Sequence, residues 1–255
     1  MAPARTIPLT IALVGASLAA WIVSFDRMRG MDAGPGTDLG GLGWYVGVWV
    51  TMTAAMMLPA VVPTALAYTV VSDRQEGAST PVFLAGYLIA WIAYGLAAYG
   101  IYRAAEHVAP SLLAWDHAGR YVAGGALVLA GLYELTPLKD VCLRHCRGPL
   151  HFVARGWRGG VRGAVWMGLE HGLYCVGCCA GLMIALFALG VMSLVWMAVI
   201  ASLIFAQKVL PRGDRLAPAF AIVFVVAGVL VVATPESVPG LHVPGDDAPQ
   251  MRMGG

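Results

Sequence analysis

Seven long apolar runs, separated by charged and turn-forming residues, constrain the fold of this chain more than any other feature. Each run comes close to or exceeds the ~20 residues that an α-helix needs to cross a bilayer. Hydrophobic residues make up 59% of the chain and charged residues only 12%, which excludes an ordinary soluble globular protein. The sequence therefore predicts an all-α fold, a polytopic membrane helix bundle of about seven transmembrane helices. The runs fall near residues 7–25, 43–71, 81–102, 118–136, 164–191, 193–210 and 216–234.

We expect a single transmembrane helical domain over residues 1–234, because the longest polar loop is too short to enclose a core of its own. Residues 235–255 are rich in Pro, Gly and Asp, which predicts a disordered C-terminal tail. The first run has a second interpretation as a cleaved signal peptide, since Arg5 precedes it and small residues occupy positions 16–20. Residues 21–25 continue the run past any cleavage site, which favours a retained span.

The distribution of positive charge predicts the orientation of the bundle. Of the sixteen Lys and Arg residues, six lie between Lys139 and Arg162 and three between Lys208 and Arg215. With seven spans these two loops share a side with Arg5 and Arg74, so that eleven basic residues lie on one side and five on the other. We expect the basic side to be the cytoplasmic side of a bacterial inner membrane, with the N-terminus inside and the C-terminus outside. Lipid headgroups and topology explain this charge better than nucleic acid does.

A histidine and three cysteines in the fifth run give the strongest sign of chemistry. His171, Cys175 and Cys178 fall on one stripe of a helix at ~100° per residue, with Cys179 about a quarter turn away. Thiolate and imidazole ligands suit zinc, copper or an iron–sulfur centre. Free cysteine also packs as a small apolar residue in buried helices, but three cysteines with a histidine at helical spacing favour a metal site.

The other two cysteines follow Pro137, which should end or kink the fourth span. If the chain resumes a helix there, Cys142, His145 and Cys146 share one face. We expect this face to point to the cytoplasm, where neighbouring basic residues favour the thiolate that binds a metal. The alternative is a pair of solvated cysteines without a function.

Two methionines in the second run bear on the identity of the metal. Met52 and Met56 lie one helical turn apart, and thioethers bind Cu(I) but hardly bind zinc. Methionines at helical spacing can equally be packing residues of the core. A relay of Cu(I) ligands from these methionines to the two cysteine clusters would require spans two, four and five to touch.

Carboxylates near the hydrocarbon usually have a partner, because an unpaired charge is costly there. We expect Glu134 or Glu170 to pair with Lys139, Lys208 or an arginine of the basic loop. A role of either carboxylate in proton or metal binding stays open.

Several motifs resemble those of a bacterial family of predicted metal-binding integral membrane proteins, over about residues 44–213. The chain departs from the family pattern at Glu134, where the family more often has Gln, and at Gln207, where a Glu often precedes the Lys. The resemblance implies metal binding. Its motifs are MTAAMMLP (Met52–Pro59), LTPLKDVCLRHCRGPL (Leu135–Leu150), MGLEHGLYCVGCC (Met167–Cys179), GVMSLVWM (Gly190–Met197) and KVLPRG (Lys208–Gly213).

We therefore expect a membrane protein that binds a soft metal, foremost Cu(I) and otherwise zinc, and that transports it or delivers it to a cuproprotein. A metallochaperone is a further expected partner, and an oligomer is compatible with the sequence. An enzymatic role is less favoured, and the chain lacks the nucleotide-binding pattern GxxxxGK[ST]. The rival hypotheses are a membrane thiol–disulfide oxidoreductase that uses Cys175 and Cys178, a haem or iron–sulfur carrier, and a structural or assembly subunit.

Overall fold

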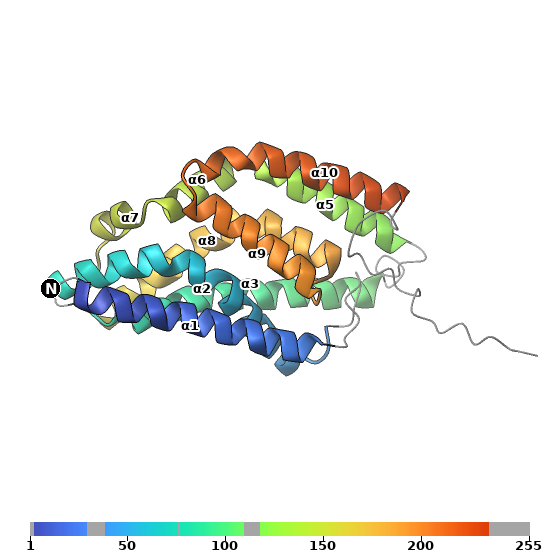
Figure 1. The fold of residues 1–255 in the computed structure, drawn as a ribbon. Helices are drawn as coiled ribbons and strands as arrows, with labels where there is room; N and C mark the ends of the chain where they lie inside the picture. The colour runs from blue at the N-terminus through green and yellow to red at the C-terminus, as the bar shows by residue number, and fades with distance from the viewer. Residues whose placement is uncertain (1–2, 30–38, 76, 110–117, 235–255) are drawn as a thin grey trace, which may run out of the picture.

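The computed structural model describes residues 3–29, 39–75, 77–109 and 118–234, and these segments are almost entirely helical (Figure 1). The predicted tail over residues 235–255 lies outside the described residues. The helices are α1 (Pro3–Met28), α2 (Leu42–Arg74), α3 (Thr80–Val108), α5 (Arg120–Glu134), α6 (Pro137–Arg147), α7 (Pro149–Arg155), α8 (Gly160–Gly190), α9 (Leu194–Val209), the 3₁₀ turn η2 (Gly213–Leu216) and α10 (Ala217–Ala233).

Each of the seven predicted apolar runs corresponds to a helix. By length and composition α1, α2, α3, α8 and the segment Gly213–Ala233 are each able to cross a membrane. α5 and α6 pass the same test together but are bent by 64° at the break between them, and α9 is a shorter apolar helix. The prediction of an all-α bundle is confirmed, with two differences in detail: the fourth run continues as a bent pair, and the sixth run forms a helix shorter than a full span.

The helices form a bundle in which α8 and α9 occupy the middle (Figure 1). α1, α2 and α3 follow one another up and down on one side, and α5 pairs with α10 on the other. α8 packs against α3, α5 and α6, while α9 packs against α2 and α8. α1 begins at one end of the bundle and α10 finishes at the opposite end.

Glycines allow α3 and α8 to approach each other closely. A Cβ atom at Gly168 would collide with the carbonyl oxygen of Phe83, and one at Gly86 would collide with the carbonyl oxygen of Val165. In lipid, helices associate through such close backbone packing rather than through the hydrophobic effect. This contact fixes the position of α8, which carries most of the cysteines.

We expect Gly168→Ala to lower the free energy of unfolding by about 1–3 kcal/mol, because the added methyl overpacks the α3–α8 contact. Gly125→Ala is the matched control, since a Cβ atom there has no neighbour within 4 Å. Denaturant titration in mixed micelles, followed by circular dichroism, measures both. Equal midpoints for the two variants would contradict the close packing.

The bend between α5 and α6 follows from local sequence. Pro137 occupies the first turn of α6, and the hydroxyl oxygen of Thr136 accepts a hydrogen bond from the backbone N–H of Lys139 at 3.4 Å. The threonine thus caps the new helix. The predicted break at Pro137, with a resumed helix after it, is confirmed.

A buried polar group holds the bend against α9. The ammonium of Lys139 pairs with Glu134 Oε2, and both side chains are 1% exposed or less. Gln207 on α9 donates a hydrogen bond to the same carboxylate oxygen at 2.7 Å. Glu170 instead pairs with Arg158 at 3.4 Å on a partly exposed surface. The expectation of a basic partner is confirmed for both carboxylates.

Candidate metal centre

Four cysteine sulfurs gather where the end of α6 packs on the middle of α8. Cys178 Sγ lies 3.7 Å from Cys146 Sγ and 3.7 Å from Cys179 Sγ. Cys175, one turn earlier on α8, is also buried, and all of these cysteines are free thiols. Two sulfurs that each lie ~2.3 Å from one metal ion at a tetrahedral angle are ~3.8 Å apart. The Cys146–Cys178 and Cys178–Cys179 separations are those of hydrogen-bonded thiols, and they also match the spacing of two ligands on one ion.

Gly177 explains how α6 brings Cys146 to this position. A Cβ atom at Gly177 would lie 2.7 Å from Cys142 Sγ, so the missing side chain leaves room for α6. Tyr133 Oη also donates a hydrogen bond to the carbonyl oxygen of Gly177 at 2.5 Å. Cys142 and Cys146 consequently face α8, and the expectation that they face the cytoplasm is wrong. Cys142 and Cys146 share one face of α6, as the spacing predicts. The packing of α6 on α8 decides in which direction this face points.

Cys175 has two polar neighbours from other helices. Lys208 Nζ on α9 lies 2.8 Å from Cys175 Sγ, and Tyr87 Oη on α3 lies 3.0 Å from it. An ammonium at this distance stabilises a thiolate, the form in which cysteine binds a metal. Lys208 was expected only as an ion-pair partner, and nothing in the sequence indicates Tyr87.

The two predicted histidines lie beside the cluster. His171 is 2% exposed, and its Nδ1 has no hydrogen-bond partner within the described part of the chain. Its ring packs among the rings of Phe83, Tyr87 and Phe152. His145 stacks on Tyr174, with ring centroids 4.1 Å apart. The imidazoles are thus held by aromatic rings, His171 one turn before Cys175 on the same helix.

The predicted ligands do not form one closed cage. Over residues 3–29, 39–75, 77–109 and 118–234, no three His, Cys, Asp or Glu side chains are placed so that one ion contacts them all. Cys178 is instead the shared member of two sulfur pairs. Cys142 is buried against Gly177, at the edge of the cluster.

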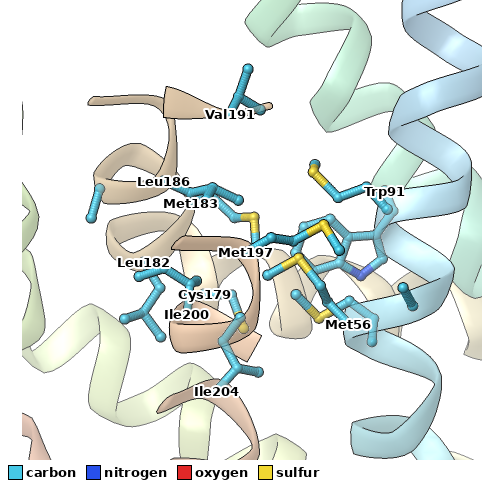
Figure 2. Packing of buried hydrophobic residues seen from close by; sticks show 14 of the residues in the cluster. Met56, Trp91, Cys179, Leu182, Met183, Leu186, Val191, Met197, Ile200 and Ile204 are labelled. Atoms are coloured by element: carbon cyan, nitrogen blue, oxygen red, sulfur yellow. The ribbon is translucent and has the colours of Figure 1, made fainter. Parts of the chain in front are cut away.

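The predicted methionines lie in the same buried cluster as the cysteines of α8. Met52 is 1% exposed and Met56 3%. In Figure 2, Met183 of α8 and Met197 of α9 lie near Met56, and this group of methionines is close to Cys179. Met183 has a signal in the sequence, because it lies four residues after Cys179 and eight after Cys175.

The fold and this site define an α-helical protein with several membrane-length apolar helices and a sulfur-lined interior. The chain belongs to the PpoB2 copper chaperone family, which matches residues 46–231 and thus most of the bundle. The protein is accordingly one that handles copper. No curated protein and no solved structure shows significant similarity to it.

Proposed function

We propose that this protein binds Cu(I) at the cysteine cluster inside the membrane and then either carries it across the bilayer or delivers it to a cuproprotein. Membership of a copper chaperone family supports the choice of metal. The observation that carries the site is the 3.7 Å separation between Cys146 Sγ of α6 and Cys178 Sγ of α8. Two different helices, separated along the chain, thus each supply a sulfur, and the two sulfurs have the spacing of metal ligands.

The arrangement of the sulfurs favours Cu(I) over zinc. A structural zinc site takes four ligands in a closed tetrahedron, whereas the sulfurs here form pairs that share Cys178. Soft thiolates select Cu(I), which tolerates fewer ligands. An incomplete set of ligands also suits a carrier, because the ion must leave again.

The electrostatics of the site support the same ion. Two thiolates and one Cu(I) carry a net charge of −1, and such a charge is costly in hydrocarbon. The ammonium of Lys208, 2.8 Å from Cys175 Sγ, supplies the compensating positive charge. A divalent ion on the same pair would leave an uncompensated positive charge.

The site lies halfway along α8, because Cys175 to Cys179 fall near the middle of Gly160–Gly190. In a bacterial inner membrane we expect this level to lie inside the bilayer. We infer from the basic loops that the N-terminus, α7 and the start of α8 are on the cytoplasmic side. A cuproprotein or metallochaperone would receive or supply the ion at a membrane surface.

The double variant Cys175→Ser/Cys178→Ser tests the site. We expect the purified full-length protein to bind Cu(I) under reducing conditions and the variant to lose most of it, because serine oxygen is a hard, neutral ligand. Elemental analysis of the detergent-solubilised protein measures the bound copper, and circular dichroism checks that the variant is folded. Loading the wild type with Zn²⁺ is the control for metal selectivity. Full retention of copper by a folded variant would refute the proposal.

The same contact gives a second candidate function. Cys146 and Cys178 come from different helices, so one sulfur is able to attack a disulfide that involves the other, as thiol–disulfide exchange requires. Rapid alkylation of thiols in cells separates the two functions. Copper binding predicts free thiols that copper protects from alkylation, whereas exchange predicts a stable oxidised population.

A further inference from the structure

The side chains of three buried methionines from three helices gather close to Cys179 (Figure 2). Met56 comes from α2, Met183 from α8 and Met197 from α9, and each residue is 3% exposed or less. We propose that the three thioethers form a second Cu(I) site, from which the ion passes to the cysteine cluster. The transfer step rests on the function proposed above, whereas the binding of Cu(I) by the thioethers does not.

The cysteines of α8 and Met183 are regularly spaced along the same helix. Cys175, Cys179 and Met183 follow one another at intervals of four residues, so they lie on one face of the helix. Each interval advances ~6 Å along the axis. A sulfur is therefore present at every turn between the cysteines and Met183.

The register of α9 brings Met197 to the same level. α8 and α9 run in opposite directions, because only Val191–Ser193 connect them. The contact of Lys208 Nζ with Cys175 Sγ at 2.8 Å fixes their alignment. Met197 precedes Lys208 by eleven residues, which places it level with about residue 186. Met197 and Met183 are thus less than one turn apart in height.

α2 and α3 pack around these methionines. Trp49 of α2 stacks on Phe187 of α8 with ring centroids 5.8 Å apart, which holds α2 against this part of α8. Trp91 of α3 lies beside the methionines (Figure 2), and its indole N–H has no hydrogen-bond partner within the part of the chain that the structure describes. Indole faces attract cations in a water-excluded site.

The buried core around the cysteines is rich in sulfur. Seven of the twelve methionines belong to the buried cluster that contains the cysteines of α8. A buried methionine loses more side-chain entropy on ordering than leucine or isoleucine does. Thioethers are also neutral, so they lie in hydrocarbon at little cost when the site holds no ion, and they discriminate against zinc.

The difference between the two kinds of sulfur gives the transfer a direction. Copper stays Cu(I) throughout, and no electron moves. Bonds from copper to thioether sulfur break as bonds to cysteine sulfur form, and each thiol that becomes a ligand releases its proton to bulk water. Anionic thiolates attract the cation more strongly than neutral thioethers, so the ion moves from Met183 towards Cys179.

X-ray absorption of the selenomethionine-labelled full-length protein, loaded with Cu(I) under reducing conditions, tests the methionine site. We expect copper–selenium scattering in the wild type and in a variant with all five cysteines changed to Ser. The triple variant Met56→Leu/Met183→Leu/Met197→Leu should lose that scattering and about one bound Cu(I) per chain. Leucine preserves the volume of methionine closely enough for the bundle to fold.

Met167→Leu is the matched control, because Met167 is also a buried methionine of α8 but packs in a separate hydrophobic cluster. It should leave the copper–selenium signal unchanged. Absence of this signal in both the wild type and the cysteine-free protein overturns the methionine site. Copper bound only through selenium, and unaffected by the cysteine changes, would instead overturn the thiolate site and leave the methionine site standing.

Discussion

Glu134→Gln is expected to lower the free energy of unfolding by about 3–5 kcal/mol, because it removes the negative partner of a buried ammonium. Lys139 pairs with Glu134 at the bend between α5 and α6, and neither side chain is more than 1% exposed. Neither water nor the neutral amide that replaces the carboxylate would restore the lost charge. Denaturant titration in mixed micelles, followed by circular dichroism, should show an earlier midpoint.

A second substitution, at Gln207, should restore the stability that Glu134→Gln removes. Gln207 donates a hydrogen bond to Glu134 Oε2 at 2.7 Å, so the double variant Glu134→Gln/Gln207→Glu keeps one carboxylate and one amide in contact. We expect it to recover most of the lost stability, since the carboxylate again lies near Lys139. Glu170→Gln is the control: its pair with Arg158 is partly exposed and should contribute no more than about 1 kcal/mol. A wild-type midpoint for Glu134→Gln would contradict the buried pair.

The fold could be predicted because its signals are local. Apolar length specifies the spans, and Thr136 with Pro137 specifies the bend, since capping and the proline ring act within one helical turn. The helical stripe of cysteines on α8 could be read in the same way. Periodicity within a helix thus predicts which side chains share a face of that helix.

The neighbours of those elements could not be predicted, because they depend on contacts between distant segments. Cys146 reaches Cys178 only because α6 packs against Gly177. The approach of Tyr87 to Cys175 depends on the close packing of α3 on α8. No spacing within a single helix encodes either contact. The surroundings of His171 were missed for the same reason, since its aromatic neighbours come from α3 and α7.

The two cysteines of α6 provide the sharpest contrast within the proposed copper site. Cys146 Sγ lies 3.7 Å from Cys178 Sγ, whereas Cys142, one turn earlier, packs against Gly177. The two residues share a helix, a face and the same substitution to serine. Differences between their variants therefore report on copper binding rather than on the general effect of replacing a thiol in α6.

Cys146→Ser is expected to weaken the binding of Cu(I) by more than about 100-fold, because the loss of a direct ligand exceeds the 10–100-fold effects of groups behind the ligands. Cys142→Ser should bind Cu(I) within a few-fold of the wild type. Competition with a chromophoric Cu(I) chelator, on the reduced protein in detergent, measures both affinities. Wild-type affinity in both variants would show that α6 contributes no ligand, and the ion would then have to be held by the other helices.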